Sequence, residues 1–182
     1  MRLRISLPVL ALFSLFACQS IDAGVKIRPH ADPGNAAAQN KLGFNYANGL
    51  GVQQDDDEAV KWFRKSAEQE IAEAQYNLGV MYDKGQGVPQ DYKTAFKWTL
   101  RAAEQGLALA QYNLGIIYTN GEGVKESLRN STFWFAKAAG NGDLQSAYYL
   151  AEAYETGEGV PKDLKMAFDL YKGVAGEALL FE

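Results

Sequence analysis

The segment NLGVMYDKGQGV, residues 77–88, decides the fold because related segments recur before and after it at a constant spacing of 36 residues. Six columns of the repeat hold one residue type in all four copies. The leucine column, for example, consists of Leu42, Leu78, Leu114 and Leu150. A fixed period of this length is typical of helical solenoids, in which each unit buries its apolar face against its neighbours. The sequence therefore predicts an all-α solenoid of four helix-turn-helix repeats.

Two helices are expected in each repeat. Apolar residues follow helical spacing in the first half, as at Ala74, Leu78, Met81 and Tyr82. A glycine in the left-handed conformation should end that helix, and a side-chain oxygen should cap the next one. The expected capping residues are Asp55, Asp91, Ser127 and Asp163. These signals predict repeats at residues 35–70, 71–106, 107–142 and 143–176, followed by a C-terminal tail at 177–182.

The motif inside these units resembles the Sel-one-like repeat, a 36-residue relative of the tetratricopeptide repeat. The matching residues of the second unit are Ala74, Leu78-Gly79, Tyr82, Gly85-x-Gly87-Val88, Asp91, Ala95, Trp98, Ala102-Ala103 and Gly106. The resemblance implies a right-handed α-α superhelix and a role as an adaptor for other proteins. The fourth unit departs most from the pattern, since Ala151 replaces the glycine after Leu150 and Leu170 replaces the tryptophan.

Residues 1–17 have the layout of a secretory signal peptide, with Arg2 and Arg4 before a short apolar run. The run is shorter than the roughly 20 residues that a membrane-spanning helix needs. Cys18 follows it and is the only cysteine of the chain. Together with residues 15–17 it resembles the bacterial lipobox, which implies cleavage before Cys18 and lipidation of its sulfur. The alternative is an ordinary signal peptide that is cut further on, for example after Ala23.

The expected location is the bacterial cell envelope. Gln19 follows the cysteine where an aspartate would signal retention, and this resembles the sorting pattern of an outer-membrane lipoprotein facing the periplasm. A secreted or soluble periplasmic protein is the alternative. Residues 18–34, with Pro29, Pro33 and the lone His30, are expected to form a flexible tether behind the lipidated cysteine, spanning roughly 20–24 Å.

Composition excludes several function classes. Without the two arginines of the signal peptide, the chain has 16 basic and 22 acidic residues and a net charge of about −6. This sign disfavours nucleic-acid binding, which depends on neutralising phosphates. One histidine and one cysteine do not make a metal site, which needs several ligands. We therefore expect no catalytic residues, no cofactor and no metal, and membrane contact through the lipid anchor only.

Outward positions of the first helices are the candidate binding residues. If the repeats stack as tetratricopeptide repeats do, these helices line a concave face. The candidate partner-binding residues are Phe44, Tyr76, Val80, Asp83, Tyr112, Ile116 and Tyr148. Tyrosines with an apolar ring and a polar tip suit peptide recognition. The alternative is that the periodic tyrosines pack between neighbouring first helices.

The sequence thus predicts a non-catalytic scaffold or adaptor that binds a protein or peptide of the cell envelope. A structural assembly factor that stacks end-on with another envelope protein is a second possibility, because residues 178–181 are apolar. A third is binding or hydrolysis of a cell-wall glycan or a β-lactam, for which the sequence offers no catalytic group.

Overall fold

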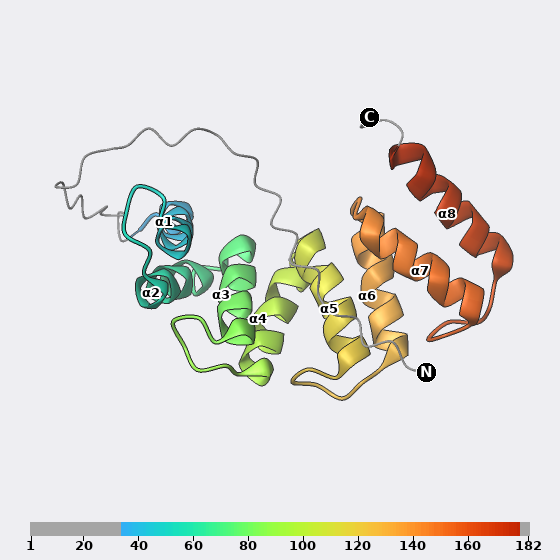
Figure 1. Cartoon of the computed structure of the whole chain (residues 1–182), viewed down its shortest axis with the longest axis horizontal. Helices are drawn as coiled ribbons and strands as arrows, with labels where there is room; N and C mark the ends of the chain where they lie inside the picture. Colours follow the sequence, from blue (N-terminus) through green and yellow to red (C-terminus); the bar gives the residue numbers. More distant parts are fainter. Residues whose placement is uncertain (1–33, 179–182) are drawn as a thin grey trace.

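The computed structural model describes residues 34–178, which form an all-α solenoid (Figure 1). Its helices are α1 (Ala36–Asn48), α2 (Asp56–Ala67), α3 (Ala72–Lys84), α4 (Tyr92–Glu104), α5 (Ala108–Asn120), α6 (Leu128–Gly140), α7 (Leu144–Thr156) and α8 (Leu164–Ala178). The expected fold class is confirmed. The signal peptide at 1–17, Cys18 and most of the tether lie outside the described residues. Helix α8 continues two residues into the predicted C-terminal tail.

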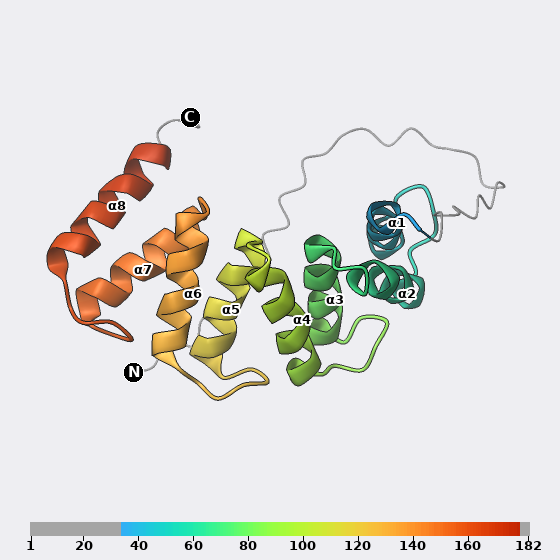
Figure 2. The same ribbon diagram turned by 180° about the vertical axis from the view of Figure 1, so that it is seen from behind.

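The helices follow one another along an arc, with α1 and α2 at one end and α8 at the other (Figure 1). The same succession is seen from behind in Figure 2. Each helix packs mainly on the helices directly before and after it in the chain. Two helices make one repeat, and each repeat buries its apolar side against the next.

The predicted helix ends are confirmed. Each first helix ends at a glycine in the left-handed conformation, with φ of 67° at Gly49 and Gly85, 73° at Gly121 and 82° at Gly157. The expected caps accept backbone N–H groups in the first turn of each second helix. The same chemistry thus places a loop of constant shape between the two helices of every repeat.

The second glycine of each loop has a role beyond the turn. Gly87 lies against the backbone carbonyl of Asp56, at the start of the second helix of the preceding repeat. Gly123 and Gly159 lie in the same way against the carbonyls of Tyr92 and Leu128. A Cβ atom at any of the three would overlap the neighbouring backbone, so glycine is required for close contact between repeats. Gly51, in the first repeat, has no atom within 4 Å of that position.

The apolar core runs through the array between successive helices. In its first part, Val60 and Phe63 of α2 pack with Leu78 and Met81 of α3. Further along, Ala102 and Ala103 of α4 pack with Leu114 of α5 and Trp134 of α6. The small alanine side chains allow these helices to approach closely.

Buried glutamines join the repeats at one level of this core. Gln39, Gln75 and Gln111 recur at the repeat period in α1, α3 and α5, and all three are buried. The side-chain amides of Gln75 and Gln111 donate to the carbonyls of Ala67 and Ala103 in the preceding repeat, at 3.2 and 3.0 Å. The buried polar atoms are therefore satisfied by contacts that also fix how one repeat sits on the next.

Candidate protein-binding surface

We use the term first-helix face for the surface formed by α1, α3, α5 and α7. Tyr76 of α3 is largely enclosed there. Its hydroxyl accepts a hydrogen bond of 3.1 Å from the side-chain amide of Asn113 in α5, and burial raises its pKa. The pair Asn40 and Asn77 makes the equivalent contact between α1 and α3, also at 3.1 Å. Tyr76 therefore packs between adjacent first helices.

Tyr112 makes a different contact with the next repeat. Its ring lies 6.1 Å from the ring of Phe135 and is stacked at 6.2 Å on Tyr149 of α7. Burial, followed by the neighbouring Tyr149, raises the pKa of Tyr112 to about 12. Tyr76 and Tyr112, two of the periodic tyrosines, thus pack between neighbouring repeats, as the alternative interpretation expected. Tyr149 itself was not among the predicted residues, because its column changes from Lys41 through two asparagines to tyrosine.

Two candidate residues of the first-helix face, Tyr148 and Phe44, are more exposed than Tyr76 and Tyr112. Tyr148 has 41% of its surface exposed and Phe44 has 38%. The ring of Tyr148 contacts Tyr149 at 6.1 Å and Tyr171 of α8 at 5.5 Å, which fixes its orientation. These two side chains have the free surface that contact with a partner requires.

Ile116 does not have that surface. Only 1% of it is exposed, so the expectation of an exposed apolar residue is wrong at this position. Its helix, α5, is flanked on the first-helix face by α3, through Asn113 and Tyr76, and by α7, through Tyr112 and Tyr149. The equivalent position of α7 holds the charged Glu152, but α7 is the last of the four first helices.

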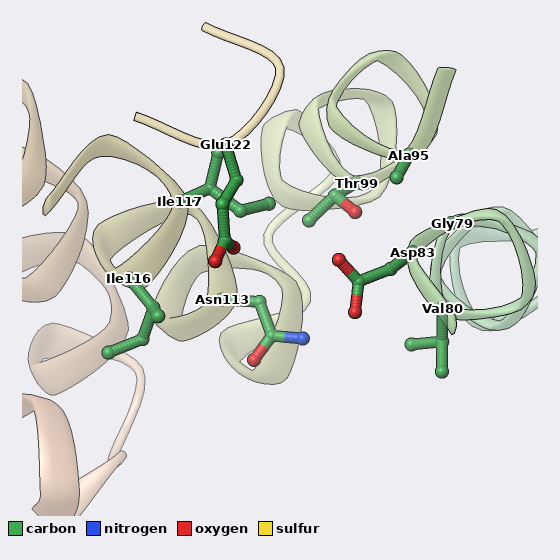
Figure 3. Close-up of a pocket in the computed structure, with 9 residues that line it drawn as sticks. All are labelled: Gly79, Val80, Asp83, Ala95, Thr99, Asn113, Ile116, Ile117 and Glu122. Atoms are coloured by element: carbon green, nitrogen blue, oxygen red, sulfur yellow. The ribbon is translucent and has the colours of Figure 1, made fainter. Parts of the chain in front are cut away.

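A small cleft lies between α3, α4 and α5 (Figure 3). It brings together three predicted residues, Val80, Asp83 and Ile116. The prediction missed Thr99, Asn113 and Glu122, which also line the cleft. Thr99 belongs to a second helix and Glu122 to the loop after α5, whereas the prediction considered the first helices only. The sequence offered one signal for Glu122: it places a charged residue between the two loop glycines, where the preceding repeat has the neutral Gln86.

Two carboxylates face each other across this cleft (Figure 3). Burial raises the pKa of Asp83, and Lys84 partly opposes the shift. Burial also raises the pKa of Glu122, and the negative charge of Asp83 adds to the rise, while a 3.3 Å hydrogen bond from Asn120 lowers it. Within residues 34–178 neither carboxylate forms an ion pair. The cleft therefore holds negative charge that no ion pair within the described chain balances.

Other features of the described chain bear on the kind of site. Residues 34–178 contain no cluster of three or more histidine, cysteine, aspartate or glutamate side chains that could hold a metal ion. Over the same range, no helix has both the length and the apolar character to cross a bilayer. The predicted lipidation site, Cys18, precedes this range.

Four segments match the Sel1 repeat, at residues 36–70, 72–107, 108–143 and 144–172. The chain belongs to the Sel1 repeat family. Sel1 repeat proteins generally act as non-catalytic scaffolds for protein–protein interaction. No curated protein sequence matches the chain significantly.

Two solved structures show how closely this Sel1 repeat array resembles known ones. A Sel1 repeat protein from Oxalobacter formigenes is 37% identical, with a TM-score of 0.76, over 79% of this chain and 59% of the other. A protective antigen of uropathogenic Escherichia coli with an SLR fold is 38% identical, with a TM-score of 0.78, over 79% of this chain and 31% of the other. The chain thus spans 59% and 31% of the lengths of these two structures.

Proposed function

We propose that this Sel1 repeat protein is a non-catalytic scaffold that binds a segment of a protein partner along the first-helix face. The observation that carries the proposal is the cleft between α3 and α5, whose unbalanced carboxylates lie between more open aromatic residues. Phe44 lies on α1 and Tyr148 on α7, so the cleft has an exposed ring on either side along the array. A partner segment that runs along the array would meet all three.

The chemistry of these residues suits a protein ligand. Aromatic side chains provide a large contact area and lose little conformational entropy when they are ordered, and they are enriched at interface hot spots. Tyr148 is already oriented by Tyr149 and Tyr171, so little further ordering is needed on binding. Leu109, also exposed, adds apolar surface at the start of α5.

The proposed setting is the bacterial envelope, with the repeats held at the outer membrane and facing the periplasm. A lipidated Cys18 at the end of a flexible tether would place the repeat array close to a membrane and leave its faces accessible. The partner would then be another envelope protein. Support for this setting comes from the lipobox-like segment alone.

A second candidate function is end-on stacking with another repeat protein. Helix α8 exposes Leu164, Met166 and Phe168, of which Phe168 has 65% of its surface exposed. At the equivalent position of the first repeat, Val60 is buried against α3. The open end therefore presents apolar surface of the kind that the next repeat covers elsewhere in the array.

Hydrolysis of a β-lactam is not supported by the cleft. Its lining contains no serine, cysteine, histidine or lysine, and its one hydroxyl group, that of Thr99, belongs to a residue only 3% exposed. The two carboxylates alone do not define a reaction. Turnover of a cell-wall glycan by the purified protein would contradict the non-catalytic proposal.

The test is site-specific photocrosslinking in intact cells. A benzophenone amino acid is placed at Phe44, Leu109 or Tyr148 on the first-helix face, and at the exposed Phe133 of α6 as a matched control. One partner captured from the three first-helix positions and not from Phe133 would support the proposal. Equal capture from Phe133, or capture of unrelated proteins at each position, would refute it.

A further inference from the structure

We infer that the cleft between α3, α4 and α5 is a subsite for one positively charged side chain, an arginine or a lysine, of the bound partner segment. This inference rests on the proposed function and gives it a chemical specificity. The cleft has an excess of negative charge and of hydrogen-bond acceptors, which a cationic donor complements.

The charges come from two different repeats. Asp83 extends from α3 and Glu122 from the loop that follows α5, and both point toward the centre of the cleft (Figure 3). Like charges in a partly desolvated space repel each other, and here the repulsion adds to the raised pKa of Glu122. A cation placed between the two carboxylates would replace this repulsion with two attractive contacts.

The polar groups around the carboxylates also favour a donor. Asn113 points into the cleft, and one N–H of its side-chain amide donates to the Tyr76 hydroxyl, while no hydrogen bond to its side-chain oxygen is formed within residues 34–178. Its side-chain oxygen therefore remains as an acceptor. A guanidinium group has five N–H donors and no acceptor, and an ammonium group has three donors and none. A neutral amide or an anion would leave part of this acceptor set unmatched.

A threonine of α4 adds a hydroxyl group to the cleft. Thr99 of α4 is 3% exposed and lines the cleft, and its side chain makes no hydrogen bond within residues 34–178. A donor that enters between Asp83 and Glu122 approaches Thr99 from the open side, and could use its oxygen as a further acceptor.

Apolar residues complete the site. Val80 and Ile117 line the cleft beside the carboxylates. Arginine and lysine carry long aliphatic stems that pack on apolar surface while the charged end reaches polar partners. Two carboxylates are few for a bound calcium ion, which takes six to eight oxygen ligands. A basic side chain matches both the charges and the apolar walls.

The test is a nuclear magnetic resonance titration of the mature chain with acetyl-arginine amide. Acetyl-citrulline amide serves as the matched neutral probe, since it has the same shape without the charge. We expect arginine to shift the amide signals of Asp83, Asn113 and Glu122, and citrulline to have little effect. No shift at these residues, or equal shifts with citrulline, would overturn the inference.

Two variants locate the effect. Asp83→Asn/Glu122→Gln should weaken binding of the arginine probe by about tenfold or more, since charge-assisted hydrogen bonds are lost. Glu68→Gln/Glu104→Gln makes the same change of charge at exposed residues that do not line the cleft, and should bind as the wild type does. Unchanged binding by the first variant, or saturation of the same signals by calcium chloride alone at lower concentration, would also contradict the inference.

The two proposals fail in different ways. If photocrosslinks form on the first-helix face but the arginine probe does not bind, the scaffold function stands and the subsite does not. If the probe binds but no partner is captured from that face, the cleft recognises a cation and the proposed function fails.

Discussion

The side-chain amide of Gln105 donates a hydrogen bond of 2.8 Å to the side-chain oxygen of the buried Gln75. Gln75 in turn donates to the carbonyl of Ala67 in the preceding repeat. Gln111 has the same relationship with Asn141 and Ala103. These chains of hydrogen bonds connect the end of one second helix to the next, so each buried glutamine acts as a polar joint between consecutive repeats.

We expect Gln75→Ala to destabilise the array by about 2 kcal/mol, because it leaves the buried carbonyl of Ala67 without this donor and opens a small cavity. The melting temperature, followed by circular dichroism, should fall by roughly 4–8 °C. Gln145→Ala, at an exposed position of α7, is the control and should change it little. Equal effects of the two changes would show that the joint contributes nothing.

Alanine at the second loop glycine separates backbone strain from contact between repeats. Gly51 and Gly87 have similar positive φ angles, 72° and 63°, but only Gly87 lies against a neighbouring backbone. Gly51→Ala should therefore lower the free energy of unfolding by only roughly 1–2 kcal/mol, which is the cost of the left-handed conformation for a residue with a Cβ atom. Gly87→Ala should lower the free energy of unfolding by about 1–3 kcal/mol more, because the loop must move away from the backbone of Asp56.

Urea denaturation of both glycine variants measures this difference. If Gly51→Ala and Gly87→Ala destabilise the protein equally, the close approach of the loop to Asp56 is not what requires glycine.

The contrast between these glycines shows what the sequence could reveal. Periodicity and capping chemistry act within one repeat, so they predicted the helices, their ends and the all-α solenoid. The contacts between repeats depend on distances that a repeat pattern does not contain. The pattern therefore predicted a turn at Gly87 and missed the carbonyl of Asp56 beneath it.

The candidate site was predicted in part for the same reason. Alignment of the repeats identified outward positions and so found Val80 and Asp83. It could not show that Ile116 is buried, nor that Glu122 reaches the cleft from a loop. Equivalent positions of different repeats also differ in exposure, as the open Tyr148 and the enclosed Tyr76 show.

Charge at the open end of α8 tests the second candidate function. If Phe168 and Leu164 form a stacking surface, the mature chain should associate as its concentration rises, and Leu164→Lys/Phe168→Glu should remain monomeric. Light scattering coupled to size-exclusion chromatography measures the mass directly. Phe133→Glu, at an exposed aromatic residue of α6, is the control and should leave association unchanged. A wild-type chain that is monomeric at all concentrations would exclude stacking between copies.

The lipid anchor is tested by Cys18→Ser. Without the sulfur no lipid can be attached, and the protein should move from the membrane fraction to the soluble fraction of the envelope. The mature wild-type chain should carry the added mass of several acyl chains on Cys18 in intact-mass spectrometry. Membrane association that persists in Cys18→Ser, or a mature chain that begins beyond Ala23, would favour the ordinary signal peptide.

The carboxylates of the cleft should reduce stability at neutral pH. The pKa values of Asp83 and Glu122 are raised in the folded protein, so between their ordinary and raised values the folded chain binds more protons than the unfolded chain does. Stability therefore decreases as pH rises through this window. Asp83→Asn/Glu122→Gln should melt at a higher temperature than the wild type at pH 7, and the advantage should disappear at a pH well below the ordinary carboxyl pKa values of about 4, where the wild-type carboxyls are protonated in both states.

Solvent screening keeps this effect small, because Asp83 and Glu122 are only partly buried. Glu68→Gln/Glu104→Gln removes the same charge from exposed positions, and should show no comparable gain at pH 7. A lower melting temperature for Asp83→Asn/Glu122→Gln at pH 7 would mean that the carboxylates stabilise the fold, and their unbalanced charge would no longer argue for a ligand. A higher one would indicate that the cleft retains charge at the expense of stability, as binding sites commonly do.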